Sequence, residues 1–121
     1  MRLRVSGSDN TSTNYNWIRG ATGQGGALSA SGSGTSANDT SWDISAVSGT
    51  RTSQVAMDVF RPFDSDFTGY TGNWGYFDSI SNFYGGFNNG SSSVTTSYTG
   101  FTFFPNSGTI TGSVRVYGYA N

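Results

Sequence analysis

The residue types that build helices are almost missing from this chain. It contains no Lys and no Glu, and it has only two Leu and two Gln. These are strong helix formers, and the few Ala are scattered among Gly and Ser. What remains is β-branched and aromatic, which suits the half-buried surface of a sheet. The composition therefore predicts an all-β protein without a helix of normal length.

Large aromatic side chains indicate that the chain is ordered, although polar residues dominate it. Ser, Thr, Asn and Gly fill more than half of the 121 positions, a composition that is common in disordered chains. Aromatic residues make up 16% of the sequence and recur along nearly all of it, which supplies the apolar area that a core needs. We expect one domain, residues 1–121, with long polar loops.

Alternation of apolar and polar residues places the expected strands. In strand 52–60, for example, Val55, Met57 and Val59 share one face. Asn88–Gly90 is typical of a hairpin turn, and 105–108 of a turn before the last strand. Short strands separated by turns predict an antiparallel two-sheet sandwich of jelly-roll type. The other expected strands are 2–6, 14–19, a weak one near 27–30, a short one at Trp42 and Ile44, about 74–80, 82–87, 92–98, 101–104 and 109–119.

The charge and the missing residue types exclude several classes of function. The net charge is −1, which argues against nucleic-acid binding and against a polybasic membrane face. No apolar run is long enough to cross a membrane. Without His, Cys, Lys or Glu, the usual general bases, nucleophiles and thiolate metal ligands are missing. We expect a protein that is not an enzyme and that uses no cofactor.

Aspartates are the remaining candidates for catalysis or metal binding. Asp64 and Asp66 are two positions apart, so in a strand they cannot flank a sugar from opposite faces, and pairing either with Asp58 or Asp78 has no support in the pattern. Asp64-Ser-Asp66 could supply oxygen ligands to Ca²⁺. Capping of a turn after Pro62 explains these residues equally well and is favoured, so we expect no catalytic residue and no metal site.

The aromatic segment between residues 70 and 87 is the best candidate for a recognition surface. Sugar rings stack on aromatic faces while amides bind their hydroxyls, and this segment combines Trp, Tyr and Phe with Asn. Trp74, Tyr76 and Tyr84 are the candidate ligand-binding residues. The alternative is that these rings fill the core, because alternation puts about half of the aromatics inside.

The last expected strand offers a candidate subunit interface. Ile110, Val114 and Val116 share one of its faces, and the polar residues share the other. Arg and Tyr are enriched at protein interfaces, so Arg115, Tyr117 and Tyr119 are the candidate contact residues. An ordinary polar outer face is an equally good interpretation.

The C-terminal sequence GFTFFPNSGTITGSVRVYGY, residues 100–119, resembles the ending of many small phage and prophage virion proteins. Their ending follows the pattern G-F-x-F-x-x-x-S-G-x-I-x-G-x-I/V-x-V-Y-G and closes a β-sandwich on tail fibres and other surface appendages. The opening at 3–10, Tyr15-x-Trp17 and the strand Val55–Phe60 are similar too. Related domains usually carry an additional strand or two before Leu3. We therefore expect a neighbouring subunit to supply that pairing, or the chain to start inside a longer gene product.

The resemblance implies a structural protein located on the virion, in a tail fibre or tail tip or as a capsid decoration protein. We expect a homo-oligomer, with a trimer favoured, that contacts other virion proteins and a host-surface glycan. Nucleic acid and membrane insertion are not expected. Two alternatives stay open: a free-standing carbohydrate-binding module or lectin, and a self-assembling extracellular filament subunit.

Overall fold

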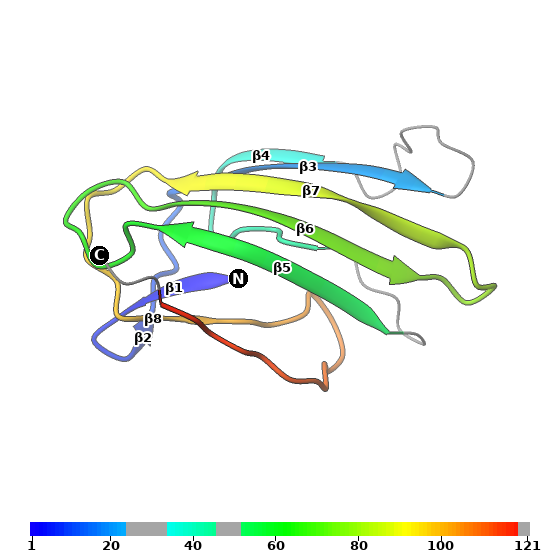
Figure 1. The fold of residues 1–121 in the computed structure, drawn as a ribbon. Helices are drawn as coiled ribbons and strands as arrows, with labels where there is room; N and C mark the ends of the chain where they lie inside the picture. The colour runs from blue at the N-terminus through cyan, green and yellow to red at the C-terminus, as the bar shows by residue number, and fades with distance from the viewer. Residues whose placement is uncertain (24–33, 46–51, 119–121) are drawn as a thin grey trace.

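The computed structural model describes residues 1–23, 34–45 and 52–118, and this part of the chain contains strands but no helix (Figure 1). Two antiparallel sheets, with strand orders β2-β1-β8 and β4-β3-β7-β6-β5, pack together as a sandwich. The predicted all-β two-sheet sandwich is confirmed. The strands are β1 (Arg2–Val5), β2 (Ser8–Asp9), β3 (Tyr15–Gly23), β4 (Gly34–Asp39), β5 (Ser53–Phe60), β6 (Gly69–Phe77), β7 (Phe83–Ser92) and β8 (Gly100–Thr102).

The five-stranded sheet has an inner face that meets the small sheet and an outer face on the opposite side. Cross-strand partners lie on the same face of a sheet. Because Tyr70 pairs with Val59 and Trp74 with Val55, the predicted common face of Val55, Met57 and Val59 is the inner one. The outer face is described below, with the candidate binding surfaces.

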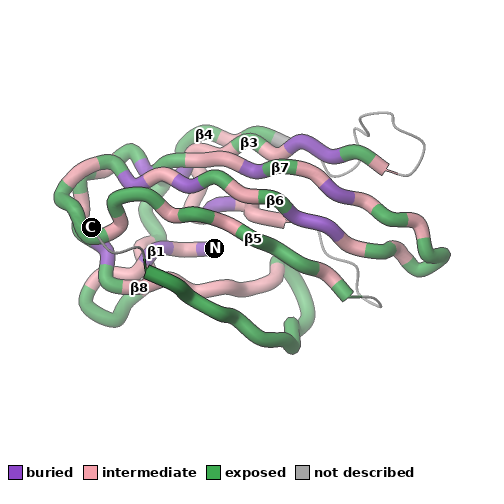
Figure 2. Tube along the Cα trace, viewed as in Figure 1, coloured by how far each residue is buried: buried purple, intermediate pink, exposed green. Residues whose placement is uncertain are grey.

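The core lies between β1 and the five-stranded sheet and is mainly aromatic. The Trp42 ring meets Tyr15 edge-on at a centroid distance of 5.4 Å and lies tilted against Tyr70 at 4.7 Å. Both arrangements are favourable for aromatic pairs. Figure 2 shows buried residues on strands of both sheets. The buried core residues are Met1, Leu3, Tyr15, Trp42, Tyr70 and Tyr98.

Two buried tyrosine hydroxyls tie separate parts of the chain together. The Tyr15 hydroxyl accepts a hydrogen bond from the Leu3 amide and donates one to the Asn10 carbonyl, both at 3.0 Å. The Tyr98 hydroxyl accepts from the Asn10 side-chain amide at 3.0 Å and shares a hydrogen bond of 3.1 Å with Ser92 Oγ. Buried polar groups are costly unless paired, and these are paired.

The segment at Trp42 and Ile44 is not a strand, so this prediction was wrong. Trp42 nevertheless faces inward and is 1% exposed. Its backbone exchanges two hydrogen bonds with Met1, of 2.7 and 2.9 Å, and its indole nitrogen donates to the Ser91 carbonyl at 3.1 Å. The backbone bonds to Met1 and the Trp42 side chain therefore hold this segment against the inner face, and we call residues 42–44 the bracket.

The strands around the aromatic segment are longer than predicted. β6 and β7 are joined by a turn at residues 78–82, whereas the predicted hairpin turn at Asn88–Gly90 lies inside β7. Gly90 is needed there for space rather than for a turn. A Cβ atom on it would lie 2.5 Å from the Tyr70 ring and 3.1 Å from the Trp42 ring.

Two further segments differ from the predicted strands. β4 forms within a Gly- and Ser-rich stretch where no strand had been predicted at residues 34–39, and residues 93–98 of the predicted strand 92–98 are irregular. The weak strand expected near 27–30 lies outside the described residues. Side-chain alternation is a poor guide in these segments because the residues are small and polar.

The last predicted strand, 109–119, was also wrong. Residues 103–118 lie in no strand, residues 106–118 are exposed, and none of the described residues from 105 to 118 makes a hydrogen bond. In Figure 1 the chain turns back after β8, and this segment returns toward the β1–β8 end of the sandwich without being part of either sheet. We call residues 109–118 the C-terminal arm. Its alternation specifies an extended conformation, but a strand also needs an edge to pair with.

Candidate binding surfaces

The three predicted ligand-binding residues come together as one stack of rings on the inner face of β6 and β7. Trp74 and Tyr76 lie 6.0 Å apart and Tyr76 and Tyr84 lie 5.3 Å apart, each pair with an interplanar angle of 15°. Burial, followed by the nearby Tyr84 and Asp78, raises the pKa of Tyr76. We call these residues the aromatic stack.

The aromatic stack leaves little ring surface for a ligand. Trp74 is 4% exposed, and its indole nitrogen donates to the Phe87 carbonyl at 3.3 Å. The Tyr84 ring lies against Gly23, where an added Cβ would approach it to 2.9 Å. Tyr76 and Tyr84 are half-buried. The stack therefore packs chiefly on itself, and Trp74 serves as part of the interior.

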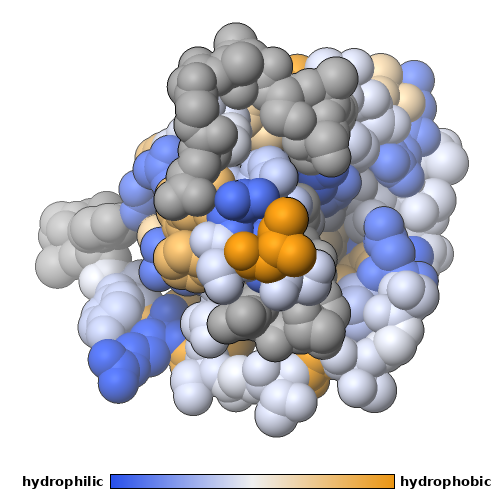
Figure 3. Space-filling model, turned by 90° about the vertical axis from the view of Figure 1, so that its right-hand side faces the viewer, coloured by the Kyte–Doolittle hydropathy of each residue, from blue (hydrophilic) through white to orange (hydrophobic). Residues whose placement is uncertain are grey.

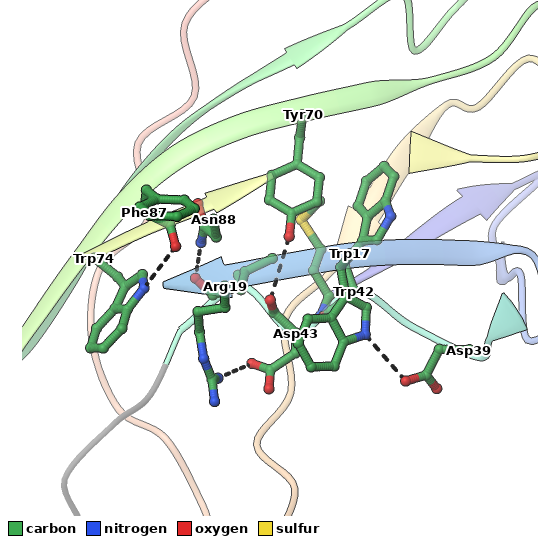
Figure 4. Close-up of polar contacts among 11 residues, drawn as sticks. Trp17, Arg19, Asp39, Trp42, Asp43, Tyr70, Trp74, Phe87 and Asn88 are labelled. Carbon is green, nitrogen blue, oxygen red and sulfur yellow. Dashed lines mark hydrogen bonds and ion pairs between the residues drawn. The ribbon is translucent and has the colours of Figure 1, made fainter. Parts of the chain in front are cut away.

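Arg19 fixes the bracket segment to the inner face (Figure 4). Its guanidinium binds the Asp43 carboxylate at 2.5 Å and lies 6.0 Å from the Trp17 ring and 5.9 Å from the Trp74 ring. Such cation–π contacts add to the ion pair in a partly desolvated site. This network joins β3, β6 and the bracket.

A second carboxylate supports the same bracket from β4. Trp17 donates its indole N–H to Asp39 Oδ2 at 3.2 Å, and the Thr40 amide donates to Asp39 Oδ1 at 2.6 Å. Burial acts to raise the pKa of the Asp39 carboxyl, but these donors outweigh it and hold the pKa below its ordinary value. Asp39 therefore stays ionised as a structural acceptor.

The outer face of the five-stranded sheet carries an aromatic surface that the sequence did not reveal. The Phe83 ring lies over Gly75, where an added Cβ would approach it to 2.8 Å, and the Phe87 ring lies over Gly20. Phe77 and Phe83 contact each other at 5.2 Å. These residues alternate with glycines, so the pattern resembles loop sequence until the strand register is known. We call this surface the outer aromatic face; its members are Ile18, Phe77, Phe83 and Phe87, which are 48, 44, 38 and 46% exposed.

Polar side chains accompany the outer aromatic face. Asn73 is the cross-strand partner of Phe87, and Thr71 of Asn89. The Thr71 hydroxyl donates to Asn89 Oδ1 at 2.6 Å, which leaves the Asn89 amide nitrogen available as a donor. Exposed rings beside amide groups form the combination that the sequence had suggested for sugar binding, though at other residues.

The candidate carboxylates are engaged in structural contacts. Arg61 binds Asp64 at 3.1 Å and Asp66 at 2.5 Å. Asp78 Oδ1 accepts hydrogen bonds from the Ile80 and Asn82 amides at 3.0 and 2.9 Å, and so shapes the β6–β7 turn. No cluster of three or more potential metal ligands occurs among the described residues.

The end of the molecule at the β6–β7 turn is not a broad apolar surface. Figure 3 shows this end, with hydrophobic residues in separate groups among hydrophilic ones. Ile80 in the turn is 76% exposed. Single exposed apolar residues are common and need no partner.

The predicted interface residues lie on the C-terminal arm. Arg115 and Tyr117 are exposed, Tyr117 to 77%, and Tyr119 lies outside the described residues. Within the described part of the chain, neither Arg115 nor Tyr117 makes a polar contact.

Comparison with known proteins gives no relative. The chain matches no protein-family model, no curated protein and no solved structure. The described residues also contain no helix that could span a membrane.

Proposed function

We propose that this chain is a structural subunit on the surface of a tailed-phage virion, in a tail fibre or tail tip or as a capsid decoration protein. It acts by assembling with copies of itself, with a trimer favoured, and with other virion proteins. The observation that carries the proposal is the C-terminal arm, whose described residues pair with no strand of their own chain. The resemblance of residues 100–119 to the ends of phage virion proteins supports the location.

The arm provides a physical reason for assembly. Ile110, Val114 and Val116 on its apolar side are 54, 62 and 70% exposed. Burying apolar surface is favourable by about 25 cal/mol per Å², and an unpaired extended segment presents free amide and carbonyl groups to other chains. Contact with another copy covers the side chains and pairs the backbone.

The test of assembly is the molar mass in solution. We expect size-exclusion chromatography with light scattering to give a closed oligomer for the full chain and one chain's mass for a variant that ends at Gly108. A full-length monomer at all concentrations would contradict the proposal. Open polymers without a fixed mass would favour the filament alternative.

The test of location uses the particle itself. Antibodies raised against the purified chain should label intact virions at the tail or evenly over the capsid in negative-stain electron microscopy. If the antibodies detected the chain in the culture medium but did not label particles, a virion role would be contradicted.

Carbohydrate binding is a second candidate function, and the outer aromatic face favours it. The rings of Phe83 and Phe87 lie over glycines, and the amides of Asn73 and Asn89 lie on the same face. Sugar rings stack on such surfaces and bind adjacent amides.

A glycan array separates this candidate from the first. We expect any glycan bound by the chain to be lost on Phe87→Ala and kept on Phe63→Ala, since Phe63 is 73% exposed on the loop between β5 and β6. Equal binding by both variants would exclude the outer aromatic face as the site.

A further inference from the structure

One edge of the five-stranded sheet is long, open and partly apolar. β5 pairs with β6 and has no strand on its other side in the described part of the chain. Along its inner row, Val55 is 39% exposed, while Met57 and Val59 are half-buried and pack against the core. An open edge of this kind attracts another strand.

The C-terminal arm matches this edge in length and in pattern. Its ten residues span about 33 Å when extended, and the eight residues of β5 span about 26 Å. Ile110, Val114 and Val116 recur on one side with the period of a strand, so they can continue the inner apolar row of β5. The opposite side of the arm is polar, as is the outer row of β5 at Gln54 and Asp58.

The other sheet edges match the arm less well. β2 has two residues and β8 has three, which are too short for a ten-residue partner. β4 has six residues of sequence GTSAND, and its pairing with β3 shifts register between Tyr15 and Trp17. Neither the length nor the polarity of these edges suits the apolar row of the arm.

We infer that the C-terminal arm of one copy adds as a strand to the β5 edge of a second copy of this chain. The arm is extended but joins neither sheet of its own chain, although the β5 edge is open there too. Addition of a strand to an open edge joins the backbones by hydrogen bonds while alternate side chains set the register. Arg115, on the polar side of the arm, would then lie on the same outer face of the sheet as Asp58. The positive charge of Arg115 is complementary to the negative charge of Asp58. This inference rests on the proposed function, because it names the contact through which the copies assemble.

The test is a cross-linking experiment that distinguishes two copies from one. The chain has no cysteine, so Ser113→Cys places a single photoreactive benzophenone maleimide on the arm. Equal amounts of ¹⁵N-labelled and unlabelled protein are unfolded, mixed, refolded, irradiated and digested with chymotrypsin. We expect cross-links from the arm to peptides containing residues 53–60, about half of which join a labelled to an unlabelled peptide if arms exchange freely.

The controls make each outcome decisive. Ala37→Cys, exposed on β4 at the opposite edge of the five-stranded sheet, should give no cross-link to 53–60. Arm cross-links that never mix labels would overturn the exchange and show pairing within one chain, while light scattering would still report whether copies assemble. Mixed cross-links to another segment would overturn the β5 site alone. A monomer without mixed cross-links would overturn both this inference and the proposed function.

Discussion

Asn88 shows how one buried side chain supports the contact between the bracket and the sheet. It is 0% exposed, its side-chain nitrogen donates to the Ile44 carbonyl, and its Oδ1 atom has no partner. Because the buried nitrogen is hydrogen-bonded and the buried oxygen is not, a small chemical change in this side chain should alter the stability of the fold.

We predict that Asn88→Asp lowers the free energy of unfolding by about 3 kcal/mol, because it removes the donor and buries a carboxylate. Asn89→Asp is the matched control. Position 89 keeps the oxygen that accepts from Thr71, so its free energy of unfolding should change by less than about 0.5 kcal/mol. Urea denaturation measures both, and equal values for the two variants would contradict the assigned role of Asn88.

The amino group of Met1 predicts an unusual pH dependence. It donates to the Trp42 carbonyl at 2.7 Å, and burial, aided by Arg2 and opposed by Asp43, lowers its pKa from 8.0 to about 6. Between these values the unfolded chain holds a proton that the folded chain does not. Stability should therefore rise as the pH increases from 6 to 8, by up to about 3 kcal/mol, and level off above 8.

The composition allows this prediction to be tested without interference from titrating side chains. Because the chain has no His, Cys or Lys, no side chain with an ordinary pKa titrates in this window. Urea midpoints at a series of pH values measure the effect. In the N-terminally acetylated chain, which keeps an N–H donor but no charge, the curve should be flat. Parallel curves for the two forms would exclude the amino group as the cause.

At the scale of the elements, glycine explains where the sequence prediction succeeded and where it failed. Alternation located β1 and β5, because large side chains mark the two faces of a strand. It failed in β7, where Asn88–Gly90 was interpreted as a turn. Glycines in β7, such as Gly86 and Gly90, leave space for aromatic rings and for the backbone of the neighbouring strand. The sequence alone does not show which positions need this space, because it depends on the strand register.

We predict that Gly86→Ala is strongly destabilising. A Cβ atom at this position would overlap the backbone carbonyl of Gly20 on β3, so the two strands would have to separate, at a cost of about 3 kcal/mol. Gly100→Ala in β8 is the control, since its nearest neighbour would be Arg4 Cβ at 4.0 Å. Its thermal midpoint should stay near that of the parent chain, and a similar loss in both variants would contradict the argument.

At the scale of the whole molecule, the sequence predicted the architecture but not the binding surfaces. A chain with few helix formers and with aromatic rings along its length has few alternatives to an all-β fold, so the class followed from composition. The aromatic stack, however, combines β6 with β7, and the outer aromatic face combines β3, β6 and β7. Local sequence patterns do not reveal which strands pair. The pairing of β6 with β5 and β7 is what places Trp74 mainly in the interior.

We predict that assembly depends on the apolar side of the arm. Val114→Asp should raise the dissociation constant of the oligomer by about tenfold or more, because burial of a valine contributes about 1.5–3 kcal/mol. Ser113→Asp adds the same charge one residue away on the polar side and should change the constant much less. Sedimentation equilibrium measures both constants, and equal weakening would show that charge rather than the apolar row is responsible.

The pairing of β1 with β8 also sets the order in which a newly made chain can mature. Leu3 lies opposite Phe101, so β1 leaves the ribosome long before the strand that completes its ladder. Until then Tyr15, Trp42 and Tyr70 lack part of the layer that covers them. Ladders between such distant segments form slowly, and partly made chains with uncovered rings are prone to aggregate. The sandwich is therefore completed only after translation has passed residue 102.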